Sequence, residues 1–168
     1  MAAAESLRVG LGLDAHRFAW ERPLIIGGVR IREHDGLAGH SDADVLVHAV
    51  IDALLGAAGM DDIGSLFPDT DPMLAGADSV GLLREVVSRL QQRDCRVVNV
   101  DAVVVCEEPR IGPHRGLMRA ILADALGVDP VAVNVKGKTT EGMGFTGRGE
   151  GIAAQAVVLL EIETTVDG

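Results

Sequence analysis

The chain has 168 residues, enough for one compact domain with its own core. Hydrophobic residues make up 48% of it but aromatic residues only 2%, so the core is aliphatic and few rings remain to stack the bases of single-stranded nucleic acid. The formal net charge of -10 argues against a nucleic-acid partner, because backbone binding depends on clustered Lys and Arg, but it leaves room for a small phosphorylated ligand held with metal ions.

The remaining composition indicates a cytoplasmic protein. Cys95 and Cys106 have neither metal-ligand spacing nor the pattern of a disulfide framework. The N-terminus lacks the charged start and apolar run of a signal peptide, and no stretch offers about 18 apolar residues to cross a membrane. We therefore expect one domain over residues 1–168, with residues 1–6 as a flexible end and no membrane partner.

The first half of the chain begins with extended segments. Residues 7–13 predict a strand, and residues 23–26 and 29–31 predict a short hairpin that turns at Gly27-Gly28. A helix should follow, with Ser41 as N-cap, acidic residues in its first turn and its end at Gly56 or Gly59. Because apolar residues lie on almost every face of this helix, we expect it to be buried.

The second half alternates helices and strands. Helical spacing marks residues 79–92 and 117–126, the latter ended by Gly127, and β-branched runs predict strands at 95–107 and 131–135. Residues 152–162 are ambiguous, with an alanine content and an amphipathic pattern that suit a helix. This order predicts a single-domain α+β fold (an α/β sandwich), with a mixed, mostly four-stranded sheet covered on one face by helices and a small N-terminal hairpin.

Asp14 and His16 lie two residues apart near the end of the first strand. Period-2 geometry puts both side chains on the same face of the sheet, where a carboxylate and an imidazole are suitable zinc ligands. The alternative is a polar strand end that faces water.

His48 lies in the otherwise apolar helix, four residues after Asp44 and therefore on the same helix face. It is either a buried histidine satisfied by Asp44 or a backbone carbonyl, or a third ligand beside Asp14 and His16. Three protein ligands with an open fourth position are typical of a catalytic zinc ion. Asp44 would then orient a ligand imidazole from behind.

Two loops are candidates for substrate binding. Residues 61–72 carry Asp61, Asp62, Asp69 and Asp71 and are either an ordinary solvated loop or a flap over a substrate. Residues 138–151 carry five glycines, whose backbone N–H groups would point at an anion, with nearby positive charge from Lys136, Lys138 and Arg148. The alternative for this second loop is a hairpin whose glycines serve geometry alone.

Five segments together carry a resemblance to a known family. They read GLDAH, IIGGVRI, GHSDADVLVHAVIDALLGAAGMDDIGSLFPDTDP, NVKGKTTE and GFTGRGEG. In this order and spacing, from Arg8 to about Leu160, the chain resembles the 2-C-methyl-D-erythritol 2,4-cyclodiphosphate synthases.

The resemblance implies a set of site residues. Zn²⁺ would be held by Asp14, His16 and His48, and a second divalent ion, Mg²⁺ or Mn²⁺, by Glu141. His40 and Thr139 would position and stabilise the transferring phosphoryl group. The methylerythritol portion would contact Ser41, Asp62, Ile63, Gly64, Phe67, Pro68, Asp69, Thr70 and Asp71. The cytidine diphosphate portion would contact Cys106, Pro109, Ile111, Gly112, Lys138 and Thr140. Phe145 and Arg148 complete the binding residues, and some members bind an isoprenoid diphosphate there.

The implied reaction is intramolecular. The 2-phosphate of 4-diphosphocytidyl-2-C-methyl-D-erythritol 2-phosphate attacks the β-phosphorus, expels CMP and closes a cyclic diphosphate, in a homotrimer with active sites between subunits. Leu11, Lys138 and Gln155 depart from the family's usual residues; Lys138 lies in the nucleotide pocket and Gln155 near the trimer axis. Two other readings stay open: a zinc-dependent phosphohydrolase with the same ligands, and a trimeric binding module without turnover.

Overall fold

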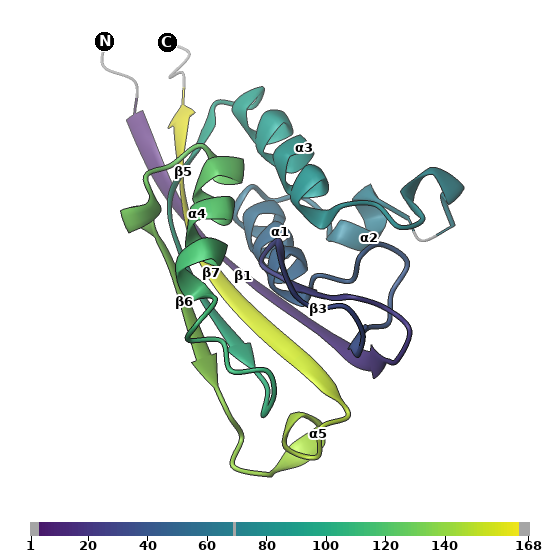
Figure 1. Cartoon of the computed structure of the whole chain (residues 1–168). Helices are drawn as coiled ribbons and strands as arrows, with labels where there is room; N and C mark the ends of the chain where they lie inside the picture. The colour runs from purple at the N-terminus through teal and green to yellow at the C-terminus, as the bar shows by residue number, and fades with distance from the viewer. Residues whose placement is uncertain (1–3, 69, 165–168) are drawn as a thin grey trace.

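A mixed sheet forms the frame of the protein in the computed structural model, which describes residues 4–68 and 70–164. In this part of the chain the sheet has five strands in the order β4-β1-β7-β5-β6 (Figure 1). Their bounds are β1 Ala4–Ala19, β4 Gly36–Leu37, β5 Cys95–Val105, β6 Val133–Lys138 and β7 Gly151–Thr164. β5 and β6 are parallel and the other pairs antiparallel. The sequence predicts a mostly four-stranded sheet, and β4, whose two residues are too few for a periodic signal, is the fifth strand.

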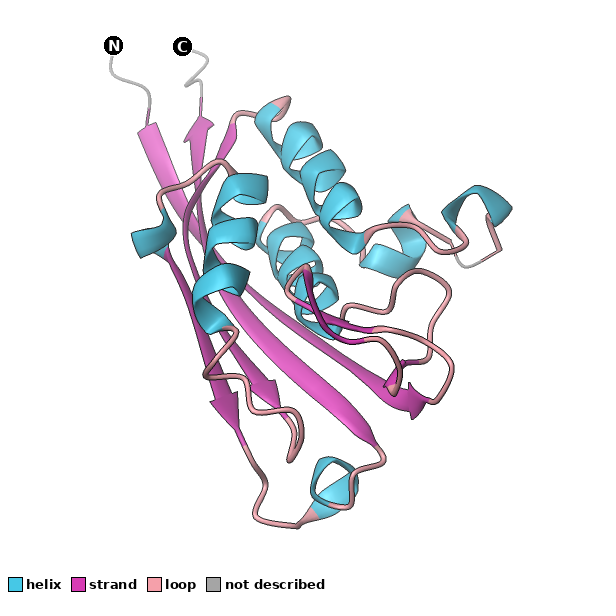
Figure 2. Ribbon diagram, viewed as in Figure 1, coloured by secondary structure: helices cyan, strands magenta, loops and turns pink. Residues whose placement is uncertain are grey.

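Helices cover one face of this sheet, as the sequence predicts (Figure 2). The long helices are α1 Val45–Ala57, α3 Ser79–Gln91 and α4 Arg115–Leu126. Shorter turns are α2 Ile63–Leu66, α5 Gly144–Gly147, η1 Pro72–Leu74 and η2 Pro130–Ala132. The predicted hairpin is present as β2 Leu24–Ile26 and β3 Val29–Arg32, and it forms a two-stranded sheet of its own. None of the described helices is both long and apolar enough to cross a membrane.

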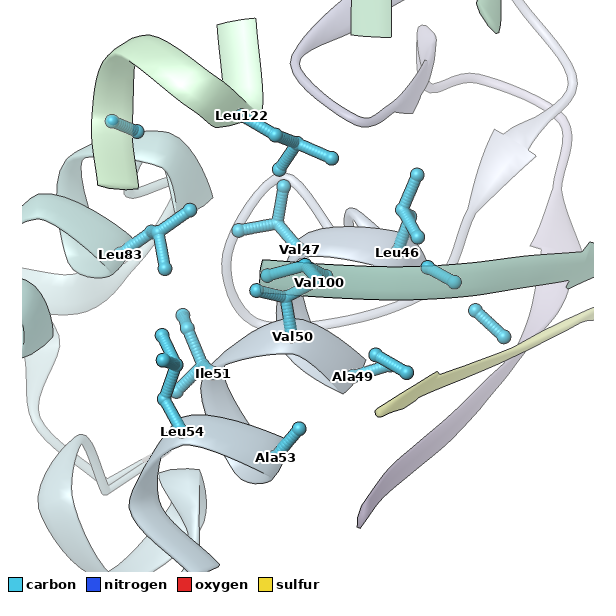
Figure 3. Packing of buried hydrophobic residues seen from close by; sticks show 14 of the residues in the cluster. Leu46, Val47, Ala49, Val50, Ile51, Ala53, Leu54, Leu83, Val100 and Leu122 are labelled. Atoms are coloured by element: carbon cyan, nitrogen blue, oxygen red, sulfur yellow. The ribbon is translucent and has the colours of Figure 1, made fainter. Parts of the chain in front are cut away.

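The core between helices and sheet is aliphatic. Figure 3 shows side chains of α1, among them Val47 and Val50, gathered with Leu83 of α3, Val100 of β5 and Leu122 of α4. All five are at most 1% exposed. This core fixes α1 between the sheet and the other two helices.

The last segment, left ambiguous by a sequence that suits a helix, is strand β7 over residues 151–164. β7 lies between β1 and β5 and is hydrogen-bonded to both. Ala154, Ala156, Val158 and Leu160 are buried under the helices, whereas Gln155 and Val157 are exposed on the other face. Small alanines suit a strand that a helix approaches closely, and this is the reason that their helix propensity misleads here.

β1 is longer than predicted and carries α1 at very short range. Gly10 and Gly12 face the helix, and a Cβ atom would lie 1.8 Å from the Ala53 carbonyl oxygen at Gly10 and 1.9 Å from the Ala49 oxygen at Gly12. Because side chains alternate along a strand, the next residues on the same face are Asp14 and His16. Because these glycines have no side chain, α1 packs against β1 at short distance, next to Asp14 and His16.

Asp44, and not Ser41, is the N-cap of α1. Its carboxylate accepts hydrogen bonds from the backbone N–H groups of Leu46 and Val47, at 3.2 and 3.1 Å, in the first helical turn. It also accepts from Gly27 and Gly28 in the hairpin turn, at 2.8 and 2.7 Å. Four backbone donors around one fully buried carboxylate tie the hairpin to the helix. At the other end Ala58 is the C-cap, and the predicted Gly59 follows it with a φ of +69° and ends the helix, since Met60 N donates to the Leu55 carbonyl oxygen at 2.9 Å and Gly59 N to that of Gly56 at 3.1 Å.

The face of the sheet opposite the helices is open and apolar. Leu7, Val9, Leu11 and Leu13 of β1 are between 60% and 70% exposed there. A contiguous apolar row of this kind indicates an interaction surface.

Candidate metal centre

Asp14, His16 and His48 converge although the last is far from the first two in the sequence. The Asp14 Oδ2 atom lies 2.8 Å from His16 Nε2 and 3.0 Å from His48 Nδ1, and the two ring nitrogens are 3.2 Å apart. Among the described residues this is the group of His, Cys, Asp and Glu side chains that could hold a metal ion. The predicted convergence is therefore confirmed.

The second nitrogen of each imidazole is held by the protein. His16 Nδ1 donates to the Ala38 carbonyl oxygen at 2.7 Å, so Nε2 is the nitrogen that faces Asp14: it donates to the carboxylate when protonated and offers a lone pair to a cation when not. His48 Nε2 lies against the hydroxyl groups of Ser79 and Ser41, at 2.9 and 3.2 Å. Each ring thus turns one nitrogen towards the carboxylate, the arrangement found in metal-ligating histidines.

The predicted role of Asp44 beside His48 is wrong. The Asp44 carboxylate is committed to backbone N–H groups, as described above, and the carboxylate that contacts the His48 ring is that of Asp14. Residues four apart in a helix lie on the same face and can contact each other. The side chain of an N-cap residue is an exception, because it bonds the backbone N–H groups of the first turn.

The charges of this group suit a divalent cation. Burial would raise the pKa of the Asp14 carboxyl, but its hydrogen bonds with His16 and His48 outweigh this and hold the pKa well below its usual range. Burial likewise opposes protonation of His16, and the hydrogen bond to Asp14 outweighs it and raises the pKa of His16. One carboxylate and two imidazoles are a donor set that zinc accepts, with a further position open.

The open position faces a cavity of about 210 Å³. Its wall contains the three metal-site residues and five others that the sequence motifs single out: His40, Ser41, Ile63, Gly64 and Phe67. Leu74 and Leu82 close it on an apolar side. A ligand in this cavity would contact the metal and the predicted methylerythritol-binding residues together.

Arg22 holds the loop that carries His40. Its guanidinium group donates to the carbonyl oxygens of Gly39 and Ser41, which flank that histidine. His40 Nε2 contacts the carbonyl oxygen of Asp71 across the cavity mouth at 3.1 Å. No sequence motif pointed to Arg22, because an arginine that binds backbone carbonyls has no characteristic spacing.

The predicted flap is a pair of short capped turns. Asp62 caps α2 by accepting from Ser65 N at 2.9 Å, and Asp71 caps η1 by accepting from Met73 N at 2.9 Å. Asp52 of α1 accepts from Ile63 N at 2.8 Å and anchors the first turn. These carboxylates are therefore occupied by backbone donors. Pro68 and Thr70 do not line the cavity, and Asp69 lies outside the described residues.

A second, larger hollow of about 770 Å³ contains the predicted nucleotide-binding residues. From the predicted set it is lined by Cys106, Pro109, Ile111, Gly112, Lys138 and Thr139. Arg110, inside the segment 106–112 that the resemblance marks as nucleotide-binding, also lines it, as does Arg115, which motif reasoning missed. Next to this hollow, the Thr139 hydroxyl donates to Glu141 Oε1 at 2.9 Å.

The glycine-rich loop does not present the open cradle of N–H groups that the sequence predicts. The N–H groups of Thr140 and Gly142 donate to Glu107 Oε1, at 3.0 and 3.3 Å, and those of Gly147 and Gly149 donate to carbonyls within the loop. Lys136 pairs with Asp101 and Arg148 with Glu150, both at 2.6 Å. The anion that this loop binds is thus a side chain of the protein itself.

Phe145 and Arg148 lie away from both hollows. Phe145 lines a small hollow beside His16, and Arg148 lines a separate one beside Trp20 and Arg32. Neither lines the metal cavity or the nucleotide hollow, although the hollow of Phe145 reaches His16.

A family model described as the YgbB family matches residues 7–161. The chain belongs to this family. A 2-C-methyl-D-erythritol 2,4-cyclodiphosphate synthase from Rubrobacter xylanophilus is 62% identical over 157 residues, which are 92% of this chain and 94% of the relative. The resemblance seen in the sequence motifs is confirmed.

Solved structures of YgbB relatives share the fold. The bifunctional IspDF of Campylobacter jejuni superposes with a TM-score of 0.91 at 39% identity, over 95% of this chain and 43% of that one. IspF of Plasmodium falciparum, solved as a CDP complex, superposes with a TM-score of 0.82 at 31% identity, over 95% of this chain and 98% of that one.

Proposed function

We propose that this protein converts 4-diphosphocytidyl-2-C-methyl-D-erythritol 2-phosphate to 2-C-methyl-D-erythritol 2,4-cyclodiphosphate and CMP, in the non-mevalonate route to isoprenoids. The observation that carries the proposal is the meeting of Asp14, His16 and His48 in a cavity lined by His40 and Ser41. Membership of the YgbB family and the 62% identical synthase supply the reaction and substrate. The relative solved with CDP supports a cytidine nucleotide as part of the substrate.

Metal ions would supply the positive charge that the reaction needs. Zn²⁺ fits Asp14, His16 and His48, and Mg²⁺ or Mn²⁺ fits Glu141, whose carboxylate lies exposed beside Thr139. Bound there, the ions would withdraw charge from the phosphate oxygens as phosphoryl transfer proceeds.

The chain's own residues would orient the substrate. His40 and Ser41 border the metal cavity and would hold the methylerythritol end against it, while Thr139 and Lys138 would hold the diphosphate end. The substrate's own phosphate is already ionised near neutral pH, so the protein needs to supply geometry and charge rather than a nucleophile.

We assign the complete site to a homotrimer. Among the described residues, the metal cavity and the nucleotide hollow share no lining residue, so a substrate that uses both fits best between two copies. The open apolar row of Leu7, Val9, Leu11 and Leu13 supplies the surface that such copies would bury. We place this reaction in the cytoplasm.

Product analysis tests the proposal. Zinc-loaded protein with Mg²⁺ and the substrate should release CMP and a cyclic diphosphate in equal amounts, followed by ³¹P NMR. Incorporation of ¹⁸O from labelled water into the products would instead identify a phosphohydrolase, and tight binding without turnover would identify a binding module. Either result overturns the proposal.

The metal ligands are tested separately. We expect His48→Ala to lose stoichiometric zinc and to lower turnover by several orders of magnitude, because an open two-ligand site holds zinc poorly. His34→Ala is the matched control, since His34 is an exposed histidine outside the cavity. Elemental analysis that finds one zinc per chain in the His48 variant would remove this residue from the ligand set.

A further inference from the structure

A hydrogen-bonded chain leads away from the metal centre through Ser79 to Asp42. Ser79 is the first residue of α3, and its side chain is fully buried. Its hydroxyl oxygen lies 2.9 Å from His48 Nε2, and the hydroxyl donates to Asp42 Oδ1. The other oxygen of the same carboxylate accepts from the backbone N–H of Ser79 at 3.1 Å. Both oxygens of Asp42 are therefore directed at this serine.

The direction of each hydrogen bond follows from the number of protons. An ionised carboxylate only accepts, so the single hydroxyl proton of Ser79 points to Asp42. The oxygen of Ser79 then offers a lone pair to His48 Nε2, which must carry the ring proton to complete the contact. His48 Nδ1 is then the nitrogen that can exchange its proton for a cation: protonated, it donates to Asp14 at 3.0 Å, and without that proton it offers its lone pair to a metal.

We propose that Asp42 and Ser79 are positioning residues that set the tautomer of His48 and so prepare its Nδ1 to bind the cation. An imidazole with its proton on Nδ1 would offer no lone pair to a metal at this point. Partners of this kind fix the ring and raise its basicity, and their loss commonly lowers metal affinity 10- to 100-fold. The inference rests on the proposed metal site but not on turnover.

The backbone around the pair is built to keep it in place. Asp42 N donates to the Ala77 carbonyl oxygen at 3.1 Å, which joins the loop before α1 to the loop before α3. Ser79 is not needed as the cap of α3, because Asp78 accepts from Val80 N and Gly81 N. Removal of the Ser79 hydroxyl should therefore leave the helix intact.

Ser41 is a weaker alternative partner for the same nitrogen. Its hydroxyl oxygen lies 3.2 Å from His48 Nε2 and accepts from Ala43 N at 3.1 Å. It has no carboxylate partner among the described residues to orient its proton, so it does not select one tautomer as Asp42 and Ser79 do. We expect it to preserve part of the metal affinity when Ser79 is changed.

Long-range ¹H–¹⁵N NMR of the metal-free protein reads the tautomer directly. At pH 8 His48 should carry a proton on Nε2, whether or not Nδ1 also donates to Asp14. A neutral ring with its single proton on Nδ1, or rapid exchange between the two neutral forms, would overturn the proposal without any variant. The result does not depend on the CMP assay, so failure of the proposed reaction and failure of this inference are distinguishable.

Variants give the second test through zinc affinity, measured by competition with a chelating dye. Ser79→Ala should lower affinity about tenfold or more and mix the His48 tautomers, and Ser88→Ala, on the exposed face of the same helix, should leave both unchanged. Asp42→Asn should also weaken zinc, because an amide has one acceptor oxygen and cannot accept from both the hydroxyl and the backbone N–H of Ser79. If one variant unfolds, the zinc affinity of the other variant and the NMR spectrum of the unchanged protein still test the proposal. Native-like affinity and tautomer in both variants would refute the role.

Discussion

Aspartates near the site have the same functional group and different roles, because their surroundings differ. Asp14 contacts two imidazoles, Asp44 is enclosed by four backbone N–H groups, and Asp42 accepts from Ser79. The sequence places all three near the predicted metal site. The groups that hydrogen-bond each carboxylate distinguish the metal ligand Asp14 from the helix cap Asp44 and the positioning residue Asp42.

Cys106 shows how burial decides reactivity at the residue scale. It is 4% exposed, and burial together with the negative charges of Glu108 and Glu107 raises the pKa of its thiol to about 11. A raised thiol pKa favours the neutral form, so at pH 8 only about one molecule in a thousand carries a thiolate. Cys106 therefore lines the nucleotide hollow as a small apolar group and not as a nucleophile.

At pH 8 we expect iodoacetamide to alkylate the Cys106 thiol far more slowly than it alkylates the thiol of free glutathione. The rate should rise about tenfold per pH unit up to pH 10, because the thiolate fraction rises in that proportion below the pKa. Peptide mapping by mass spectrometry separates Cys106 from Cys95. Modification of Cys106 at the rate of glutathione would contradict the buried, neutral thiol.

At the scale of elements, the contact between β1 and α1 builds the metal centre. Two ligands come from the strand and one from the helix, and Gly10 and Gly12 set the short distance between them. The segment 152–162, ambiguous in the sequence with features that suit a helix, is decided at this same scale. β7 must be a strand because it fills the gap between β1 and β5, and a pattern of alanines alone does not reveal these neighbours.

Gly12→Ala tests the close contact. Its Cβ atom would lie 1.9 Å from the Ala49 oxygen and 2.6 Å from Ala53 N, so α1 must shift. Overpacking of this kind costs about 1–3 kcal/mol, and we expect a lower free energy of unfolding together with weaker zinc binding. Urea denaturation and chelator competition measure the two effects.

The matched control for that change is Gly56→Ala in α1. A Cβ atom there has nothing within 4 Å, and alanine is favoured over glycine in a helix by about 1 kcal/mol. Stability should stay level or rise, with zinc binding unchanged. If Gly12→Ala behaved like Gly56→Ala, the glycine would not be what positions α1.

At the scale of the whole molecule, one chain holds two incomplete hollows and one uncovered sheet face. The metal cavity and the nucleotide hollow are lined by separate residues, and the row from Leu7 to Leu13 faces outward on β1. In the proposed trimer the copies would bury the apolar row, and a substrate would use the metal cavity of one copy and the nucleotide hollow of another.

Leu11→Glu tests this arrangement. The side chain is 66% exposed in the single chain, so the monomer should fold normally, but a charge buried between copies without a partner is strongly unfavourable. We expect sedimentation velocity to show a monomer with turnover lost. Val131→Glu is the control, since Val131 is 82% exposed at the distant η2 turn and should leave the trimer intact. A Leu11 variant that stays trimeric would place the interface elsewhere.

Local periodicity in the sequence determined most of the elements and the shared face of Asp14 and His16, because strand and helix geometry depends on neighbouring residues. The order of the motifs was enough to predict the family and the three converging ligands. Only the tertiary structure decided that Asp44 caps a helix, that Glu107 occupies the N–H groups of the glycine-rich loop, and that Asp42 and Ser79 reach His48. These contacts join segments up to 37 residues apart, and hydrogen-bond partners at such separation are selected by packing, which no local pattern records.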